Sequence, residues 1–269
     1  MKKFLILLLV LLTGCSNTNI QAENSLSMHI FKIGKADSIL LSFEDHHVLI
    51  DTGEDEDAEE IIAYLNEQKI DSLDALIITH FDKDHVGGAD HIINNMAIKS
   101  IYTANYESDS KQTKQFLQAA DNKKLTIQKV SEQLAVKLGD QQLHIYPAEQ
   151  TEYDGDNDYS LIATLTYGTV SFLLTGDAEE ARLKELLNNE ALAQPFTIVK
   201  MPHHGRFNEL TTTFVETVKP QYAVMTSSNK HVEAQETVTA LENVGSAIYT
   251  TRNGDIHIET DGTKVTVVQ

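Results

Sequence analysis

Short apolar runs that end at turn residues or at acidic and histidine side chains make up most of this chain from residue 26 onward. Runs that alternate with polar residues, or that are continuously apolar, predict β-strands. The predicted strands cover residues 27–33, 37–43, 46–51, 74–78, 98–103, 125–130, 134–138, 141–146, 161–167, 170–174, 196–200, 222–226, 247–250, 256–260 and 265–268. Apolar residues at helical spacing predict helices between them. The predicted helices lie around residues 61–65, 85–95, 109–121, 178–188 and 235–243.

The order of these elements predicts the architecture. The first three strands form one antiparallel meander, and the last three form another with turns at Asn253-Gly254 and Asp261-Gly262. Strands alternate with helices between the two meanders. This order predicts an α/β fold in which two sheets pack face to face with helices on the outside. No Pro-rich linker divides residues 26–269, so we expect one domain there.

The most informative polar stretch follows the apolar residues 74–78. Its metal-binding side chains lie within six positions and are His80, Asp82, Asp84 and His85. A buried strand presents such groups at its carboxyl end, where open α/β sheets bind ligands. Charges that are removed from water there need compensation, which a cation supplies. The stretch therefore predicts a metal site, and Asp84 is also placed to cap the helix that follows.

Three further groups stand at predicted strand ends: Asp177, the pair His203-His204, and His231. Alone, Asp177 could be a helix N-cap and His231 a surface residue. Because each group follows a buried apolar run, we expect all of them on the same rim as the central stretch. Together they predict a site for two metals, which activate water and bind a substrate oxygen.

The N-terminus has the pattern of a bacterial secretory signal. Two lysines precede an apolar run over residues 4–12 that is too short to span a membrane as a mature helix. A tetrapeptide that resembles a lipobox follows and ends at Cys15, the only cysteine, so we expect no disulfide and no thiolate ligand. We expect a lipoprotein signal peptide over residues 1–15, a polar tether over 16–25, and an extracytoplasmic protein lipid-anchored to a bacterial membrane. An ordinary signal peptide is the alternative.

The charge of the chain limits its ligands. The formal net charge is −19, and it becomes −21 without residues 1–15, which carry two lysines. Such a surface repels long polyanions and makes duplex nucleic acid an unlikely partner. The acidic run over residues 54–60 favours the N-terminus of the helix after it and is not expected to bind a cation. A single phosphate group held by metals stays compatible with this charge.

A family resemblance rests on several motifs together. The stretch His80-x-Asp82-x-Asp84-His85 resembles the His-x-His-x-Asp-His motif of the metallo-β-lactamase superfamily, with aspartate in place of the second histidine. Four more motifs extend this to the hydrolase domain of ComEC competence proteins: Asn157-x-x-Ser160, Leu174-Thr175-Gly176-Asp177, Pro202-His203-His204-Gly205 and Tyr249-x-Thr251-x-x-Gly254-x-Ile256. Secreted free-standing relatives and bacterial phosphorylcholine esterases are similar. The resemblance covers about residues 26–269 and implies an αβ/βα four-layer sandwich with a dinuclear site.

The resemblance implies a role for each candidate ligand. One metal would be bound by His80 and Asp82. The second would be bound by Asp84, His85 and His231. Asp177 would bridge the two metals. It leaves open which of His203 and His204 binds the first metal and which faces the substrate. Two divalent ions, zinc or manganese, are implied, and the extra oxygen ligand of Asp82 shifts the preference towards manganese.

Four other residues are expected to support the site or to meet the substrate. Asp51 would hold a metal ligand through a hydrogen bond. Asn157 and Ser160 lie where the family has a third-motif histidine, which this chain lacks. Arg206 follows His-His-Gly where the family usually has serine, and it could bind a phosphate through two hydrogen bonds or stay solvated.

These expectations converge on a membrane-anchored, metal-dependent hydrolase of phosphodiesters. Metal-activated water would attack, Asp84 would orient it, and His204 would protonate the leaving oxygen. One alternative is an acyl hydrolase of lactones, thioesters or β-lactams, and another is a lipoprotein that binds metal without catalysis. We expect a monomer that acts on small phosphodiesters or short single strands and contacts the membrane through a lipid on Cys15.

Overall fold

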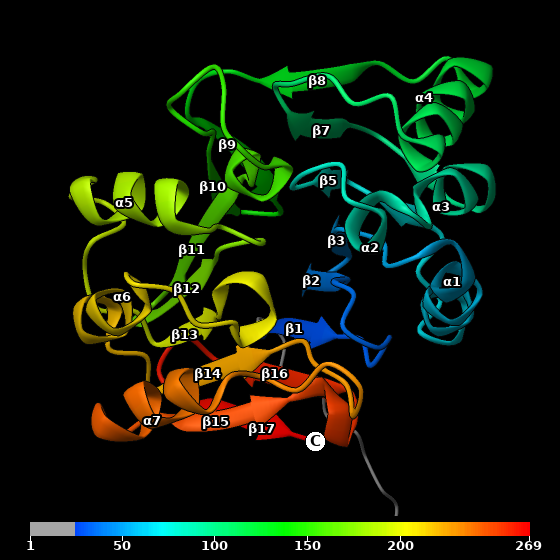
Figure 1. The fold of residues 1–269 in the computed structure, drawn as a ribbon. Helices are drawn as coiled ribbons and strands as arrows, with labels where there is room; N and C mark the ends of the chain where they lie inside the picture. Colours follow the sequence, from blue (N-terminus) through cyan, green and yellow to red (C-terminus); the bar gives the residue numbers. More distant parts are fainter. Residues whose placement is uncertain (1–24) are drawn as a thin grey trace, which may run out of the picture.

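The computed structural model describes residues 25–269, which form four layers (Figure 1). Two large sheets pack face to face, with α1, α3 and α4 outside one and α5, α6 and α7 outside the other. The helices are α1 (Ala58–Glu67), α2 (Lys83–Val86), α3 (Ala89–Asn95), α4 (Lys111–Lys123), α5 (Glu180–Asn188), α6 (Thr211–Val218) and α7 (Gln235–Asn243). The predicted αβ/βα sandwich of two mixed sheets is confirmed.

The first sheet has eight strands in the order β17-β16-β1-β2-β3-β5-β7-β8. These strands are β1 (Leu26–Ile30), β2 (Ile39–Phe43), β3 (His46–Ile50), β5 (Ala75–Ile78), β7 (Ile101–Ala104), β8 (Ile127–Val130), β16 (Ile256–Thr260) and β17 (Val265–Val268). The opening meander is antiparallel as predicted, and β3, β5, β7 and β8 are parallel. The carboxyl ends of β3 and β5 therefore meet at one edge of this sheet.

The second sheet has seven strands in the order β15-β14-β13-β12-β11-β10-β9. These strands are β9 (Leu134–Leu138), β10 (Gln141–Tyr146), β11 (Ile162–Tyr167), β12 (Val170–Leu174), β13 (Ile198–Lys200), β14 (Tyr222–Met225) and β15 (Ala247–Thr250). From β12 to β15 the strands are parallel, so their carboxyl ends also share an edge. Two short strands, β4 (Ser72–Leu73) and β6 (Ala97–Ile98), form a separate pair.

Apolar side chains fill the space between the two sheets. Met28 and Leu41 of the first sheet and Leu165 and Phe172 of the second belong to one buried cluster. A second cluster lies between the second sheet and its helices, and it includes Phe214 of α6. The continuous core between the sheets fixes their edges relative to each other, and the site described below is built on those edges.

One element was not predicted, and one prediction about elements is wrong. The sequence analysis gave no helix over residues 211–218, where α6 forms and buries Phe214, Val215 and Val218. The last three strands are not one meander, because β15 pairs with β14 in the second sheet while β16 pairs with β1 in the first. The turn at Asn253-Gly254 therefore passes the chain from one sheet to the other.

The expected signal peptide over residues 1–15, the lipobox cysteine Cys15 and nearly all of the tether over 16–25 lie outside the described residues. Within residues 25–269, no helix combines the length and apolar character that crossing a bilayer requires.

Candidate metal centre

The carboxyl ends of four strands, two from each sheet, converge on one point. Asp51 follows β3, and His80 lies two residues after the end of β5. From the second sheet, Asp177 follows β12, and His203 and His204 follow β13 in the short 3₁₀ helix η3 (Pro202–Gly205). The one-turn helix α2 carries Asp84 and His85 to the same point from beyond β5. The sandwich thus brings together residues more than 100 positions apart in sequence.

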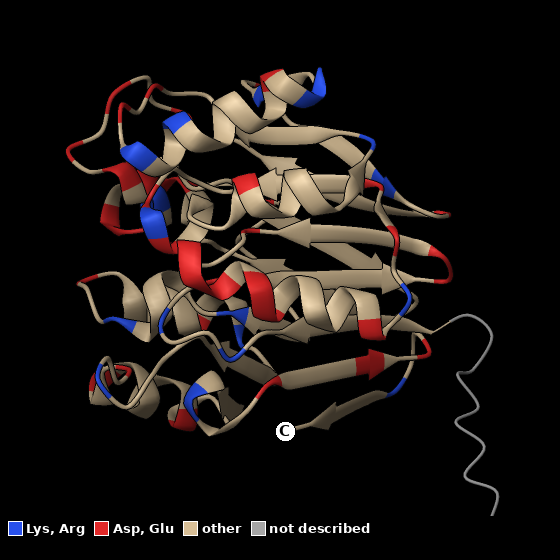
Figure 2. Ribbon diagram, turned by 90° about the vertical axis from the view of Figure 1, so that its right-hand side faces the viewer, with Lys and Arg blue, Asp and Glu red and all other residues tan. Residues whose placement is uncertain are grey.

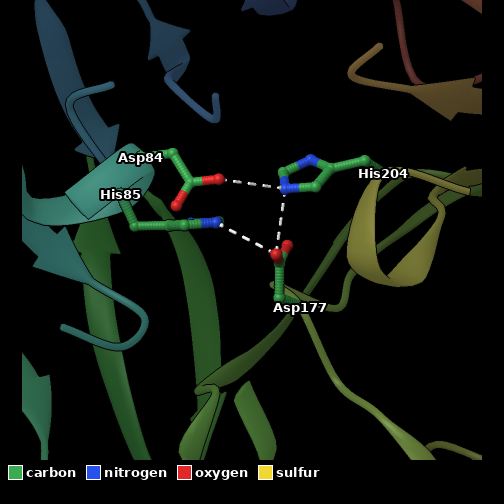
Figure 3. A group of neighbouring side chains, drawn as sticks. All are labelled: Asp84, His85, Asp177 and His204. Carbon is green, nitrogen blue, oxygen red and sulfur yellow. Dashed lines mark ion pairs between the residues drawn. The ribbon is translucent and has the colours of Figure 1, made fainter. Parts of the chain in front are cut away.

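Four side chains form the centre of this arrangement, and Figure 3 shows them pointing at one another. They are Asp84, His85, Asp177 and His204. Each offers one ligand atom, and these atoms all lie within 4.8 Å of one another. Oδ2 of Asp177 lies 3.3 Å from Nε2 of His85 and 2.9 Å from Nε2 of His204. All four residues are buried, and this burial and spacing suit a single metal ion bound among them.

Unpartnered polar atoms test whether a metal fits. Within the described residues, Nε2 of His85, Nε2 of His204 and Oδ1 of Asp177 are buried without a hydrogen-bond partner. Their contacts are ion pairs instead: Oδ2 of Asp177 lies against both histidine rings, and Oδ1 of Asp177 is 3.5 Å from Nζ of Lys200. A divalent cation would fit among these atoms, because imidazole nitrogens and carboxylate oxygens are the groups that bind such metals. Nε2 of His80, just beside the cluster, has no partner either.

The opposite ring nitrogen of each histidine is held by the protein. Nδ1 of His85 lies 2.8 Å from Oδ2 of Asp51, whose carboxylate also accepts hydrogen bonds from the amide and hydroxyl of Thr79. Nδ1 of His204 lies 3.0 Å from the hydroxyl of Thr226. Contacts of this kind orient a histidine so that its Nε2 faces a metal. Asp51 therefore lies where the family resemblance implied, behind a candidate ligand.

Three residues of the centre have a left-handed backbone that only glycine adopts without cost. The φ angles are +59° at Asp51, +43° at His203 and +57° at His204. Such conformations cost on the order of 1–3 kcal/mol each and cluster at functional sites. These backbone conformations direct the three side chains towards the convergence point.

His80 and Asp82 lie beside the group of four rather than in it. Nε2 of His80 is 3.9 Å from Oδ2 of Asp82, and the His80 ring centroid is 4.1 Å from that of His85. The Asp82 side chain is 42% exposed, whereas His80 is buried. Asp82, not Asp84, stands at the N-cap position of α2, and no side-chain cap hydrogen bond forms there. The expected capping by Asp84 is therefore wrong, since Asp84 lies inside α2.

The two adjacent histidines have different surroundings. His204 belongs to the central group, whereas Nε2 of His203 is 3.8 Å from Oδ2 of Asp177 and its Nδ1 is 2.8 Å from Oε1 of Glu179. His231 was expected to complete the second metal site, but it lies exposed in a turn closed by backbone hydrogen bonds with Ser228. The structure thus places His204 where the sequence had predicted His231, because β14 ends before the turn that carries His231 outward.

The remaining candidates lie around this group. The Ser160 hydroxyl accepts a hydrogen bond from the Asp177 amide at 3.0 Å. Asn157 donates a hydrogen bond to Glu179 at 3.2 Å. Arg206 lines a pocket of about 230 Å³ with His203 and Phe207.

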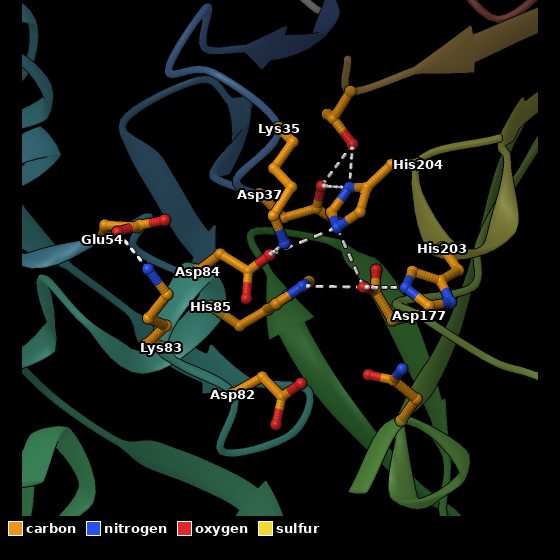
Figure 4. A network of polar contacts seen from close by, with 12 residues as sticks. Lys35, Asp37, Glu54, Asp82, Lys83, Asp84, His85, Asp177, His203 and His204 are labelled. Atoms are coloured by element: carbon orange, nitrogen blue, oxygen red, sulfur yellow. Dashed lines mark hydrogen bonds and ion pairs between the residues drawn. The ribbon is translucent and has the colours of Figure 1, made fainter. Parts of the chain in front are cut away.

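Lysine and aspartate side chains that sequence reasoning missed complete the centre (Figure 4). Lys200 is fully buried, forms an ion pair with Asp37, and lies 3.5 Å from Oδ1 of Asp177. Lys35 forms an ion pair with Oδ2 of Asp84. No local sequence pattern signals these side chains; Lys200 ends an apolar strand, but Met201 and Pro202 separate it from the pair of histidines.

The carboxylates determine the protonation of the centre. Burial lowers the pKa of His204, but the neighbouring carboxylates, chiefly that of Asp177, outweigh burial and raise it to about 9. The pKa of His85 is raised well above its usual value against burial, by Asp177 and Asp51. Burial works against ionisation of Asp177, yet the surrounding positive charge holds its pKa well below the usual value. In the metal-free centre the carboxylates are thus balanced by protonated histidines and lysine, and a metal ion would have to displace the histidine protons.

A second group of potential ligands, Asp37, Asp51 and His85, is already paired within the protein. Asp37 contacts Lys200 and accepts a hydrogen bond from Thr226. The carboxylate of Asp51 is paired as described above. This group therefore lies behind the ligands, and within residues 25–269 the other group that could hold a metal is Asp84, His85, Asp177 and His204.

Comparisons with known proteins agree with this geometry. The model of the metallo-β-lactamase superfamily matches residues 33–226, so the chain belongs to that superfamily. ComE operon protein 3 of Bacillus subtilis is 28% identical over 172 residues, which cover 64% of this chain and 22% of that protein. Competence protein ComA of Neisseria gonorrhoeae is 26% identical over 206 residues, which cover 76% of this chain and 27% of that protein. The resemblance to ComEC-type competence proteins is thereby confirmed.

The fold is also seen in solved structures. The metallo-β-lactamase fold protein YhfI from Bacillus subtilis matches with a TM-score of 0.61 and 12% identity, over 88% of this chain and 100% of that one. At this identity the match shows the fold alone. The chain spans about a quarter of the length of the two competence proteins that it matches.

Proposed function

We propose that this protein is an extracytoplasmic, membrane-anchored hydrolase that depends on a divalent metal and cleaves small phosphodiesters. The observation that carries the proposal is the convergence of Asp84, His85, Asp177 and His204, whose ligand atoms are buried and all lie within 4.8 Å of one another. A divalent ion bound there would acidify water and polarise a phosphoryl oxygen. Membership of the metallo-β-lactamase superfamily supports hydrolysis as the reaction type.

The ligand set suits zinc or manganese. It combines two imidazole nitrogens with two carboxylates, and Asp82 adds a further oxygen nearby. Imidazole suits zinc, whereas a larger share of oxygen ligands suits manganese. The sequence resemblance implied two ions.

The pocket beside the centre supports a phosphodiester as substrate. It holds about 230 Å³, which suits a small molecule. Its lining includes Arg206 and His203 together with two acidic residues, Glu179 and Glu180. A guanidinium group can bind two oxygens of a phosphate at once. The Phe207 side chain is 44% exposed and offers an apolar surface to the rest of the substrate.

In this proposal His203, and not His204, is the side chain placed to accept a proton. Burial lowers the pKa of His203 to about 4, so its ring is neutral at pH 7. Its contact with Glu179 fixes the hydrogen on Nδ1 and leaves Nε2 free to accept a proton. His204, by contrast, is occupied with the metal position.

The proposed location rests on the sequence of residues 1–15. Two lysines, the apolar run and Cys15 support export followed by lipid attachment. The match to two proteins named for competence is consistent with a role at the cell envelope.

The experiment is turnover by the full chain, first stripped of metal and then loaded with zinc or manganese. We expect hydrolysis of bis(p-nitrophenyl) phosphate that disappears on chelation and in Asp177→Asn. Arg206→Ala should raise KM for the phosphodiester while metal content stays unchanged, because Arg206 lines the pocket and not the metal position. Efficient hydrolysis of lactones, thioesters or β-lactams without any phosphodiester turnover would replace this proposal by an acyl hydrolase.

A further inference from the structure

Two lysine side chains reach the metal centre from different elements. Lys200, at the end of β13, pairs with Asp37 and lies close to Asp177. Lys35, from the loop between β1 and β2, pairs with Asp84, and Figure 4 shows its amino group reaching that carboxylate. Each lysine thus places one positive charge on a candidate metal ligand.

The loop that carries Lys35 is fixed to the helix that carries Asp84. The amide of Asp37 donates to the carbonyl of Asp84 at 3.0 Å, and the amide of Gly53 donates to the carbonyl of Asp37 at 2.9 Å. The side chain of Lys35 is only 24% exposed. These contacts make the Lys35–Asp84 pair part of the folded structure rather than a mobile surface contact.

Formal charges around the centre then limit how many ions it can hold. Its interior carboxylates, each at most 6% exposed, are Asp37, Asp51, Asp84 and Asp177. Lys35 and Lys200 offset two of these four negative charges. One divalent ion offsets the other two. A second ion would bring two more positive charges beside His80, where only the partly exposed carboxylate of Asp82 stands to offset them, and unpaired charge in the interior is costly.

We propose that the centre binds one divalent ion, between Asp84, His85, Asp177 and His204, and that Lys35 supplies the positive charge that a second ion would bring. The side chains that stand where a second ion would bind agree with a single ion. His80 and the half-exposed Asp82 stand there without the third-motif histidine of the superfamily pattern, and His231 lies exposed. The inference rests on the proposed metal-dependent function, but it concerns only the number of ions and the role of Lys35.

Metal titration of the full chain tests the inference without an activity assay. Chelator-stripped protein is titrated with Zn²⁺, bound ions are counted by native mass spectrometry, and the dissociation constant is measured by competition with a chromogenic chelator. We expect one ion per chain. Lys35→Met should lower the dissociation constant about tenfold or more, because a positive charge next to Asp84 repels the ion.

Two control variants separate this effect from general changes in surface charge. Lys83→Met removes an exposed lysine from the same helix as Asp84, where it pairs with Glu54, and should bind Zn²⁺ like the wild type. Lys35→Arg keeps the charge and should also resemble the wild type. A thermal melt of each metal-free variant confirms that it is folded.

Distinct results would overturn the two proposals. Two Zn²⁺ ions of comparable affinity in the wild type would overturn the single-ion inference and leave the proposed hydrolase intact. Unchanged or weaker binding in folded Lys35→Met would overturn the role of Lys35. Failure of the wild type to bind any divalent ion would overturn the metal-dependent function itself.

Discussion

At the scale of single residues, His203 and His204 are neighbours in sequence that the backbone sends in different directions. Their left-handed conformations in η3 turn Nε2 of His204 into the group of ligands, whereas His203 lies between Glu179 and the pocket. One histidine is therefore placed to bind metal and the other to meet the substrate. Sequence alone left these two roles open.

This difference predicts two separate phenotypes. His204→Ala should lose most of its bound metal and its turnover together, because a ligand is removed. His203→Ala should keep its metal but lose about 100-fold or more in kcat, the usual contribution of a positioned acid or base. Metal content by mass spectrometry alongside turnover checks both. Equal loss of metal in the two variants would contradict the assignment.

The raised pKa of His204 predicts how the metal-free protein responds to pH. Its pKa is about 9 in the folded protein and close to 6.5 in an unfolded chain, so folding favours the protonated form. The resulting stability is complete below pH 6.5 and is lost as the pH rises towards 9, by about 3 kcal/mol. The melting temperature of chelated protein should fall across this window, and His204→Gln should flatten the change. If the melting temperature of the metal-free wild type rose between about pH 6.5 and 9, this would argue against a protonated His204.

Bound metal should reverse the sign of this pH dependence. The metal binds the unprotonated ring, so its affinity rises as the proton on His204 is released. The sequence placed this titration near pH 6.5, whereas the surrounding carboxylates move it upward.

Residues at strand ends were predictable from sequence, but their partners were not. Asp177 and the stretch from His80 to His85 follow apolar runs directly, and such runs mark the carboxyl ends of strands. Lys35, Asp37 and Lys200 have no local pattern that signals a site. Their contacts exist only because β1, β2 and β13 meet in the folded sandwich.

At the scale of elements, the position of α2 depends on close contact with the loop after β3. A Cβ atom at Gly87 would lie 2.7 Å from the Cα of Glu54 and closer still to the carbonyl oxygen of Lys83. The amide of Thr52 also donates to the carbonyl of His85 at 2.8 Å. Because Gly87 has no side chain, α2 and the loop after β3 can approach closely enough to align His85 with Asp51.

A single methyl group at this contact should move the metal ligands. Gly87→Ala should destabilise the protein by about 2 kcal/mol and weaken metal binding, because overpacking displaces α2. Gly155→Ala is the matched control, since nothing lies within 4 Å of its added Cβ. Chemical denaturation and metal titration of both variants give the comparison. Equal stability of the two would show that α2 is not held by this contact.

Helix α6 and the last strands show where prediction of elements failed. No helix was predicted in the threonine-rich segment, and the Asn-Gly turn argued for a hairpin between β15 and β16. Packing of Phe214 against the second sheet and pairing of β16 with β1 decided otherwise. Both are contacts between distant segments, which a local pattern does not contain.

At the scale of the whole molecule, the net charge of −19 and the small pocket point to a small substrate. On the face that α1, α3 and α4 cover, α1 carries acidic residues and no basic ones, whereas α4 carries lysines near both of its ends (Figure 2). A protein gains affinity for duplex DNA mainly when its basic groups displace counterions from the phosphates into solution. The acidic composition of this chain does not favour such binding.

Anchoring through Cys15 is a prediction of the sequence that can be tested on cells. Cys15→Ala should move the protein from the membrane fraction to the soluble fraction or block its maturation, because stable attachment requires the added acyl chains. Cell fractionation followed by immunoblotting checks this. Wild-type membrane association of the variant would show that another segment or partner holds the protein there.

Anomalous X-ray scattering from crystals loaded with zinc or manganese tests the central claim most directly. We predict an anomalous peak for one metal ion at about 2.0–2.2 Å from Nε2 of His85 and His204 and from carboxylate oxygens of Asp84 and Asp177. Crystals of Asp177→Asn grown under the same conditions should show a much weaker peak. A strong peak elsewhere, or no peak at this position in fully loaded wild-type crystals, would contradict the metal centre proposed for this protein.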